Sequence, residues 1–306
     1  MSESLSRLMP KQYAINQSPL YKLVGLRQLE LCLGIDLERL DKLLKDGSYR
    51  TWVNDNDRAI QHPLGWLAQV HSKIAHYLAK IETPDYVYHK KGRSHVKNAS
   101  EHTGYHLVAK TDISNYYPSI TRAMLKSMFV KKFKCALDVA GILADICTYQ
   151  RTHLATGSGV SGYLAFWASK DLFDAVYELS RARGCVFTLY VDDLTISGNA
   201  ASKKLLTEVR AIVKRNGLKT KETKSKTFAA HATKMVTGVV LKGNESLLSN
   251  KRHKEIADNR IAIANTGNAN IKATLQKSLK GRLMAAKQII DSNEIKTVTS
   301  SDLIYS

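Results

Sequence analysis

The sequence predicts an α+β fold, in which a β-hairpin that carries acidic residues is framed by amphipathic helices. Two short apolar runs, at 186–189 and 194–197, flank Tyr190-Val191-Asp192-Asp193, and this order is typical of a hairpin with two carboxylates at its tip. A further strand is expected over 107–113, and it ends close to another acid, Asp112. Apolar residues at helical spacing around these segments complete the mixed pattern.

Helices are expected wherever apolar residues recur every three or four positions. Ser18-Pro19 favours a helix start, Gly47 and Gly184 are expected to follow helix ends, and Gly238 precedes a short strand over 239–241. One helix is expected to begin at Ser18. The others are expected over 36–45, 63–80, 121–133, 136–149, 161–182 and 202–216. In chain order this gives strand, helices, hairpin, helix and strand around the acidic segments.

The acidic residues of the hairpin indicate a metal site. Adjacent aspartates are poor strand formers and repel each other, so they need cations or solvent around them. Mg²⁺ prefers such carboxylate oxygens and leaves positions open for phosphates. With Asp112 beside Asp192 and Asp193, a site for two ions about 3.5 to 4 Å apart becomes possible. The alternatives are two exposed acids in a turn and, for Asp112, an N-cap of the following helix.

The order of the motifs resembles that of reverse transcriptases. The segments that carry the likeness are 57–63 with Arg58 (R-x-I-x-x-P), 112–120 (first palm motif), 154–162 (Gln-Gly-x-x-x-Ser-Pro loop), 190–193 (Y-x-D-D) and 217–224 with Lys224 (fourth motif). Each motif is short, but their order along about 200 residues matches that of the family. The resemblance runs from about Arg58 to Lys254.

Two further signatures narrow the resemblance to bacterial retron reverse transcriptases. Asn98-Ala99-Ser100-Glu101-His102 matches the N-A-x-x-H pattern, and Val236-Thr237-Gly238 matches V-T-G. Some positions depart from the family: Thr156 and Gly162 stand where Gln and Pro are usual, and the lysine often found before Arg58 is missing. These departures bear on nucleotide selection and on triphosphate binding.

The resemblance implies a right-hand polymerase architecture with fingers, a palm built as an antiparallel sheet with helices, and a helical thumb. It implies an N-terminal helical segment over 1–47, fingers and palm over 48–240, and an RNA-binding thumb over 241–306. In this arrangement Asp112 and Asp192 are expected to bridge two Mg²⁺ ions, and Asp193 is expected to assist. Lys224, or Lys226 in its place, is expected to protonate the leaving pyrophosphate.

Further residues are expected around the dNTP substrate. By resemblance, the carbonyl of Ile113 completes one metal site, and Tyr117 matches the bulky residue that excludes a 2′-hydroxyl. Core packing is the alternative for Tyr117. The residues expected to bind the incoming nucleotide are Arg58, Ile113, Tyr117 and Gly157.

The charge of the chain indicates a polyanionic partner. The 46 Lys and Arg residues exceed the 27 Asp and Glu residues and give a net charge of +19. Lysines that neutralise phosphates release counterions, which supplies affinity without sequence choice. The residues expected to bind RNA are Asn98, His102, Val236, Thr237, Gly238, Lys251, Arg252 and Lys254. The alternatives are that Asn98 and His102 fasten a loop, and that many of the lysines lie on solvated faces.

These features predict a retron-type, RNA-directed DNA polymerase that copies part of a structured non-coding RNA into single-stranded DNA. By resemblance, the product is a branched RNA-DNA molecule (msDNA), and the protein acts in anti-phage defence with a separate effector protein. A chain of 306 residues leaves no room for a fused RNase H, so host RNase H is expected to remove the RNA. No signal peptide or membrane span is evident, and the four cysteines read as reduced core residues, so we expect a cytoplasmic protein. The alternatives are a group II intron-like or diversity-generating reverse transcriptase, and a non-catalytic RNA-binding scaffold.

Overall fold

A computed structural model describes residues 12–40, 44 and 47–301 of the chain. The chain divides into two compact units, each built from separate stretches of sequence. Unit 1 is formed by Met1–Asp85, Ile113–Ala175 and Ile212–Lys219, and unit 2 by Tyr86–Asp112, Val176–Ala211 and Thr220–Ser306. The helices α10 (Lys170–Arg181) and α11 (Lys203–Arg215) contribute residues to both units.

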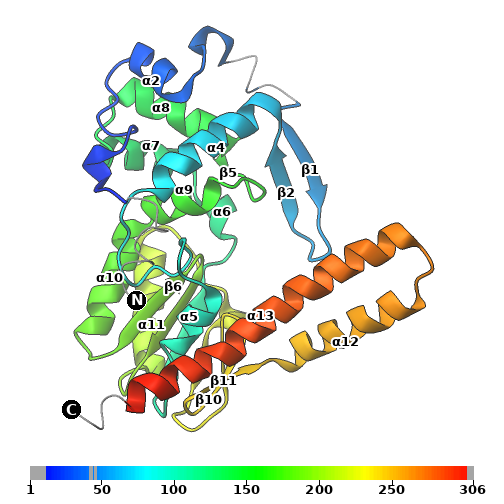
Figure 1. Ribbon diagram of the computed structural model, residues 1–306. Helices are drawn as coiled ribbons and strands as arrows, with labels where there is room; N and C mark the ends of the chain where they lie inside the picture. The colour runs from blue at the N-terminus through cyan, green and yellow to red at the C-terminus, as the bar shows by residue number, and fades with distance from the viewer. Residues whose placement is uncertain (1–11, 41–43, 45–46, 302–306) are drawn as a thin grey trace. The chain divides into compact units, whose positions relative to one another are not determined.

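Unit 1 is mainly helical (Figure 1). Its helices are α2 (Leu26–Leu33), α4 (Gly65–Ala79), α6 (Tyr116–Ser119), α7 (Arg122–Lys131), α8 (Leu137–Cys147) and α9 (Ser161–Ala168), with the 3-10 turns η1 (Ile15–Gln17) and η2 (Leu37–Arg39). Its strands form two antiparallel pairs, β1 (Tyr49–Val53) with β2 (Ala59–Pro63) and β4 (Thr148–Tyr149) with β5 (His153–Leu154). Apolar residues at helical spacing on α4, including Leu67, Ile74 and Leu78, are buried in the core of this unit.

Unit 2 contains two antiparallel sheets. The larger sheet has the order β6-β7-β3-β8, with β6 at Val186–Tyr190, β7 at Asp193–Ser197, β3 at Val108–Asp112 and β8 at Lys226–Phe228. The smaller sheet has the order β11-β10-β9, with β11 at Glu245–Leu248, β10 at Val239–Lys242 and β9 at Lys234–Val236. The remaining elements are α5 (His95–Ser100), η3 (Glu222–Lys224), α12 (Asn250–Asn265) and α13 (Ala269–Ser301).

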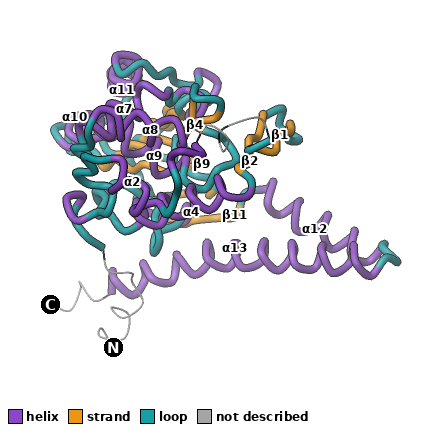
Figure 2. The backbone as a smooth tube through the Cα atoms, turned by 90° about the horizontal axis from the view of Figure 1, so that it is seen from above, coloured by secondary structure: helices purple, strands orange, loops and turns teal. Residues whose placement is uncertain are grey.

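One apolar core joins α5, both sheets and α13. Its buried members are Val96, Ala99, Val108, Val236, Val239, Leu241 and Ile289, with Phe228 and Leu248 packed at its edge. The helices α12 and α13 lie side by side in both views and extend away from this core as an arm, which we call the α12–α13 arm (Figures 1 and 2). The base of this arm is therefore held by the same core that supports the strand ending at Asp112.

The structure confirms most of the expected elements and the α+β class. The helices expected at 63–80, 121–133, 136–149 and 202–216 are present as α4, α7, α8 and α11, and the hairpin and both expected strands are present. The helix expected over 161–182 is broken at Ser169, whose N–H is shared between the carbonyls of Ala165 and Phe166.

The N-terminal prediction was wrong in part. Residues 19–22 form a turn, and the helix begins only at Leu26, because long-range bonds hold the preceding backbone. The N–H of Lys22 donates to the carbonyl of Phe133 at 2.8 Å, and the N–H of Ala136 donates to the carbonyl of Leu23 at 2.9 Å. Of the helix expected over 36–45, the structure shows the 3-10 helix η2 and an α-helical bond from the N–H of Leu44 to the carbonyl of Leu40 at 3.0 Å, and 41–43 and 45–46 lie outside the described residues. Within the described ranges, no helix is long and apolar enough to cross a bilayer.

Candidate active site

The three predicted carboxylates meet at one end of the larger sheet of unit 2. Asp112 is the last residue of β3, and it lies directly opposite Asp193, the first residue of β7. Asp192 occupies the two-residue turn between Tyr190 and Asp193, which are paired across β6 and β7. Directly paired residues of an antiparallel sheet have side chains on the same face, so two carboxylates face each other and the third is adjacent.

Two lysines approach these carboxylates. The ammonium of Lys224, from η3, forms an ion pair with Oδ2 of Asp112. The ammonium of Lys110 lies 3.7 Å from Oδ2 of Asp193, and the hydroxyl of Thr195 donates to Oδ1 of Asp193 at 3.1 Å. The Oδ1 atom of Asp112 is buried and accepts no hydrogen bond from the described residues. The site therefore retains an acceptor that the described part of the chain does not satisfy.

The pKa values show that negative charge is only partly compensated at this end of the sheet. Burial raises the pKa of Asp192 to about 6, and the neighbouring charges of Asp112 and Asp193 add to this effect. Burial also raises the pKa of Asp193, against the opposing influence of Lys110. The pKa of Lys224 is raised, chiefly by its hydrogen bond to Asp112. A bound cation would relieve the same repulsion.

The hairpin turn holds its acidic residue on a strained backbone. Val191 has φ of +61°, a conformation that β-branched residues rarely adopt. Its N–H donates to Nδ1 of His89 at 3.1 Å. Burial lowers the pKa of His89 to about 4, so its ring is neutral and can accept this bond. His89 thus supports the residue next to Asp192.

The donor set fits a hard cation. Carboxylate oxygens are the ligands that divalent hard cations prefer, and Asp112 Oδ1 is an acceptor among them that no described residue satisfies. Within the part of the chain that the structure describes, no group of three Asp, Glu, His or Cys side chains stands in the geometry of a metal site. The carboxylates are thus suitable donors that are not arranged around a common point. Lys224 contributes to this arrangement, because its ammonium is paired with one oxygen of Asp112.

The residues expected around the nucleotide belong to unit 1. Arg58 is exposed in the turn between β1 and β2, and Ile113 follows Asp112 and is buried. Tyr117 is half-buried beside Tyr116, which is buried and stacks on it with ring centroids 5.8 Å apart. Tyr116 therefore occupies the core position, whereas Tyr117 remains partly accessible.

Gly157 is required by the packing of its loop. Its N–H donates to the carbonyl of Gln61 at 3.1 Å, and a Cβ at this position would lie 2.8 Å from that carbonyl oxygen. The N–H of Thr156 donates to Oε1 of Gln61 at 2.9 Å. A Cβ on Gly162 would lie 3.5 Å from the hydroxyl of Tyr117, so this glycine adjoins the residue expected to select the sugar.

A family comparison agrees with this arrangement. Residues 43–255, more than half of the chain, match the model of the family described as reverse transcriptase (RNA-dependent DNA polymerase). The chain belongs to the reverse transcriptase family. Members of this family use divalent metal ions and dNTPs, which agrees with the carboxylates described above. The predicted membership of the reverse transcriptase family is thus confirmed.

Curated proteins similar to this chain include retron reverse transcriptases. The chain is 29% identical over 184 residues to the retron Se72 reverse transcriptase of Salmonella heidelberg (strain 579083-10), covering 57% of this chain and 48% of that protein. It is 27% identical over 171 residues to the retron Ec86 reverse transcriptase of Escherichia coli, covering 55% of this chain and 52% of that protein. The matched region spans about half the length of these two relatives.

The N-A-x-x-H segment lies in unit 2 and buries its Asn, Ala and His residues, whereas Glu101 is exposed. Asn98 and His102 have no exposed surface. The two ring nitrogens of His102 lie 2.7 Å from the hydroxyls of Ser197 and Thr188, on β7 and β6. Burial lowers the pKa of His102 to about 3. This geometry favours the alternative that Asn98 and His102 fasten the surrounding backbone.

The V-T-G segment forms the tight turn between β9 and β10. Val236 is buried and paired with Val239, so Thr237 and Gly238 are the two turn residues, with φ of +43° and +78°. Positive φ at both positions is typical of the hairpin turns that match the twist of paired strands. The hydroxyl of Thr237 donates to the carbonyl of His95 at 2.7 Å and lies 3.5 Å from Nδ2 of Asn98.

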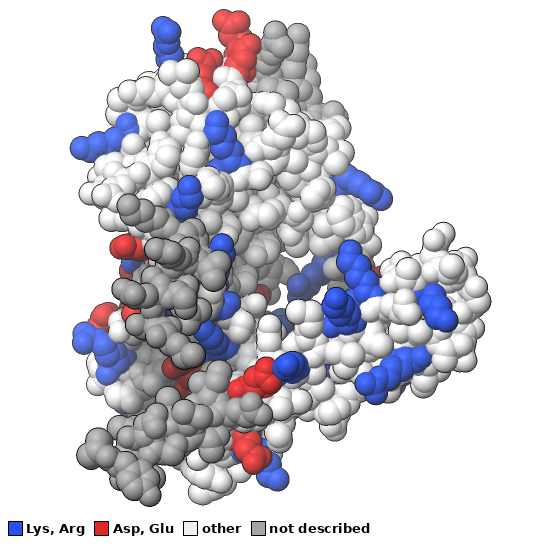
Figure 3. Space-filling view, viewed as in Figure 1, with Lys and Arg blue, Asp and Glu red and all other residues white. Residues whose placement is uncertain are grey.

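The predicted basic contacts lie at the start of α12. Lys251 and Lys254 are exposed, whereas Arg252 is half-buried. Basic side chains continue along the visible face of the α12–α13 arm (Figure 3). The Lys and Arg residues of this arm up to residue 293 are Lys251, Arg252, Lys254, Arg260, Lys272, Lys277, Lys280, Arg282 and Lys287, against the acids Glu255, Asp258 and Asp291. The arm thus offers a positively charged surface.

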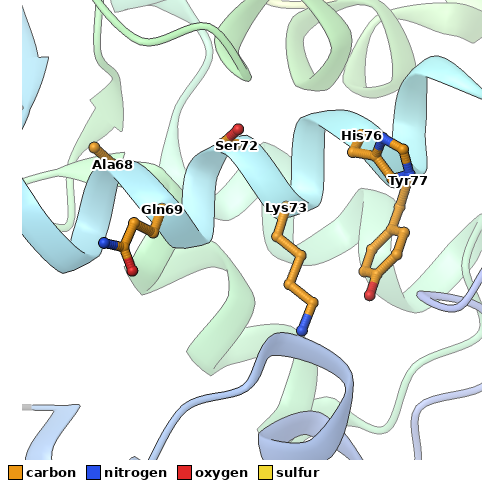
Figure 4. A pocket seen from close by; sticks show the side chains of 6 residues that line it. All are labelled: Ala68, Gln69, Ser72, Lys73, His76 and Tyr77. Atoms are coloured by element: carbon orange, nitrogen blue, oxygen red, sulfur yellow. The ribbon is translucent and has the colours of Figure 1, made fainter.

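A separate hollow lies on α4 in unit 1 and contains none of the predicted site residues. It is shallow, and its lining residues are Ala68, Gln69, Ser72, Lys73, His76 and Tyr77 (Figure 4). The side chain of Lys73 extends toward Gly34, where a Cβ would lie 3.3 Å from its ammonium.

Three residues around the site were missed in the sequence. Lys110 could have been found, because it lies two positions before Asp112 and therefore on the same face of the strand. His89 and His95 lie in a segment without a recognisable pattern, and only the fold brings them to the two turns.

Proposed function

We propose that the chain is a retron-type, RNA-directed DNA polymerase that copies part of a structured non-coding RNA into single-stranded DNA. The observation that carries the proposal is the pairing of Asp112 with Asp193 across β3 and β7, next to Asp192 in the hairpin turn. Membership of the reverse transcriptase family and the similarity to retron enzymes support it. A polymerase of this kind would have the right-hand architecture, with fingers and palm over 48–240 and a thumb over 241–306. The segment over 1–47 precedes them, and its residues 1–11 lie outside the described residues.

Catalysis in this proposal consists of positioning and charge neutralisation. Two Mg²⁺ ions, held by Asp112, Asp192 and Asp193 with the carbonyl of Ile113, would activate the primer hydroxyl and stabilise the charge on the triphosphate. The β3–β7 register holds the carboxylates in place, and Lys110 and Thr195 restrain Asp193. Lys224, which forms an ion pair with Asp112, would yield this carboxylate to the cations, and its ammonium would supply a proton to the leaving pyrophosphate, with Lys226 as the nearby alternative.

Nucleotide selection is assigned to unit 1. The ring of Tyr117 is partly accessible, and in this proposal it would clash with a 2′-hydroxyl and so restrict the enzyme to dNTPs. Gly157 would offer its backbone to the nucleotide from a loop that packs against Gln61, and Arg58 is exposed to bind phosphate.

The partner is a structured RNA. The lysines of the α12–α13 arm bind its phosphates, and recognition of folded RNA rests on shape and 2′-hydroxyls more than on base edges. We propose that the product is msDNA, a branched RNA-DNA molecule, that host RNase H removes copied RNA, and that a separate effector protein uses the complex in anti-phage defence in the cytoplasm.

The nucleic acid that co-purifies with the chain tests this function. Expressed with its neighbouring non-coding RNA, the protein is expected to retain a covalently joined RNA-DNA molecule, detected by sequencing before and after RNase treatment. It is also expected to extend an annealed DNA primer on a generic RNA template. RNA alone, together with no primer extension, would instead establish the non-catalytic scaffold. Primer extension without a branched product would leave a reverse transcriptase of another type.

A further inference from the structure

Arg252 differs from the lysines beside it in where its side chain lies. Lys251 and Lys254 are exposed, but the guanidinium of Arg252 is directed into unit 2. Its Nη2 lies 3.2 Å from Nε2 of His95 and approaches the V-T-G turn so closely that a Cβ on Gly238 would be 3.3 Å away. A residue that was predicted to bind RNA is therefore already engaged in an internal contact.

His95 joins three segments of unit 2. Its carbonyl accepts the hydroxyl of Thr237 at 2.7 Å, and its ring meets Tyr190 edge to face, with centroids 6.5 Å apart. Arginine can only donate, so Nε2 of His95 accepts from Arg252, and the neutral ring carries its proton on Nδ1. Burial and the charge of Arg252 lower the pKa of His95, which favours this neutral form. The end of β6, the V-T-G turn and the start of α12 thus converge on one residue.

The other contacts of α12 beyond its first turn run to α13, where Glu255 pairs with Arg282 at 3.7 Å and Nδ2 of Asn259 donates to the carbonyl of Leu275 at 3.5 Å. Among the described residues of α12, only Ile256 and Asn259 are buried. The apolar core of unit 2 instead reaches the arm through Ile289, near the end of α13. The contacts of Arg252 therefore fix the end of α12 that follows β11, and through His95 they connect it to Tyr190, two residues before Asp192.

We propose that His95, Thr237 and Arg252 form a latch that sets the base of the α12–α13 arm against the hairpin carrying Asp192 and Asp193. Resting on the function proposed above, the latch places nucleic acid held by the arm in register with the carboxylates. Arg252 is then a positioning residue that acts through His95, and Lys251 and Lys254 are the phosphate contacts at this end of α12.

The experiment compares R252Q with the double variant K251Q/K254Q in the full chain, using an annealed generic RNA template and DNA primer. The R252Q variant should lower kcat about tenfold, because small displacements of reacting groups have large effects on rate. Its KM for the template-primer and the salt dependence of RNA binding should stay within twofold of wild type. The K251Q/K254Q variant should instead raise KM and reduce the slope of log affinity against log salt by roughly 0.7 to 0.9 for each phosphate that the variant no longer neutralises.

Conservative variants separate a latch from general damage to the fold. His95→Gln keeps an acceptor for Arg252 and should restore at least half of the kcat that His95→Ala loses, with both variants melting within a few degrees of each other. The latch is wrong if R252Q flattens the salt dependence as the lysine variants do, or if His95→Gln and His95→Ala are equally slow. A wild-type protein that does not extend the primer would refute the proposed function instead, and the salt dependence of RNA binding would still decide the role of Arg252.

Discussion

Two hairpin turns of unit 2 share a β-branched residue at positive φ but differ in how their polar groups are used. The turn between β6 and β7 and the turn between β9 and β10 each have two residues, and each places a β-branched residue at positive φ, Val191 at +61° and Thr237 at +43°. Such residues cost about 1 kcal/mol or more in this conformation, and they persist only where the surroundings hold them. Histidines of one short segment provide part of that support, His89 for Val191 and His95 for Thr237.

The difference between the turns lies in their polar groups. At the β6–β7 turn, burial and like charge raise the pKa of Asp192, and the nearby Asp112 retains an Oδ1 that no described residue satisfies. At the β9–β10 turn, the hydroxyl of Thr237 both donates to His95 and approaches Asn98. The first turn lies beside an acceptor that no described residue satisfies, and in the second turn the side chain of Thr237 hydrogen-bonds within the protein. Strain alone therefore does not distinguish the two turns, whereas the unsatisfied oxygen of Asp112 beside the β6–β7 turn does, and it supports the proposed catalytic role of that turn.

The N-A-x-x-H segment connects the two turns. Asn98 contacts the β9–β10 turn through Thr237, and His102 contacts both strands of the β6–β7 hairpin through Thr188 and Ser197. The two polar residues of one signature thus support both hairpins from inside the unit. Changes at the β6–β7 turn should therefore affect mainly activity, and changes at the supporting residues should affect mainly the free energy of unfolding.

The largest effect is expected from removing charge at the β6–β7 turn. Asp192→Asn should reduce DNA synthesis more than about a hundredfold, because the ligand set for the cations is broken. The same change should leave the melting temperature equal or higher, because the raised pKa of Asp192 shows that its ionised form is disfavoured in the fold at neutral pH. Primer extension measures the loss of DNA synthesis, and thermal unfolding in EDTA measures the melting temperature. Asp258→Asn, at an exposed position of α12, is the matched control. Wild-type activity in Asp192→Asn would contradict the role of the turn.

The next effect is expected at His102, where stability should fall. His102→Ala leaves the hydroxyls of Ser197 and Thr188 without their imidazole partner and opens a cavity, which should lower the free energy of unfolding by about 3 kcal/mol. Urea unfolding measures this loss, and His253→Ala, at an exposed position of α12, should change it by less than about 0.5 kcal/mol. A loss below about 1 kcal/mol would show that the buried imidazole is not a support of the hairpin.

The carboxylate hairpin was predictable because its signal is local. Two apolar runs around an acidic turn identify both strands, and the pairing of Asp112 with Asp193 follows once β3 is placed beside β7. The role of the N-A-x-x-H segment was not predictable in the same way. The partners of His102 lie 95 and 86 residues away in the chain, and a polar motif in a basic protein suggests RNA contact until burial is known.

The same limit explains the error at Ser18-Pro19. These residues favour a helix start, but the contacts of Lys22 and Leu23 with the 133–136 segment fix the backbone as a turn. Lys22 has φ of +54°, which no helical propensity would indicate. Long-range backbone bonds overrode the local preference.

Lowering the pH should change the contributions of the buried histidines and of Asp192 to the free energy of unfolding in opposite directions. Burial lowers the pKa of His71 to about 4 and of His102 to about 3, so below their unfolded value of about 6.5 the unfolded state binds protons first. Stability that is present above pH 6.5 is then lost, by about 1.4 kcal/mol per pH unit for each histidine. Asp192 has a folded pKa of about 6, above its ordinary value of 3.8, so the folded state binds a proton there and offsets about one histidine.

Removing Asp192 should therefore steepen the acid dependence. Between pH 6.5 and 5, wild-type protein in EDTA should lose less stability than Asp192→Asn, by about 1 kcal/mol, since the variant lacks the offsetting proton. Urea unfolding at pH 7, 6 and 5 measures both slopes. Equal slopes would mean that the charge at the β6–β7 turn is already compensated by its lysines.

The smallest effect compares the two strained residues directly. Val191→Gly relieves positive φ but adds freedom to the unfolded chain, and since each term is about 1 kcal/mol, stability should change by less than about 0.5 kcal/mol. Thr237→Gly relieves the same strain but also removes the hydroxyl that donates to the carbonyl of His95, and should cost about 1 kcal/mol more. Thr237→Ser keeps the hydroxyl and should fall between Thr237→Gly and wild type. Urea unfolding of the three variants checks this order. An equal change in both glycine variants would show that the side chain of Thr237 contributes nothing to the β9–β10 turn, and that backbone geometry alone holds both turns.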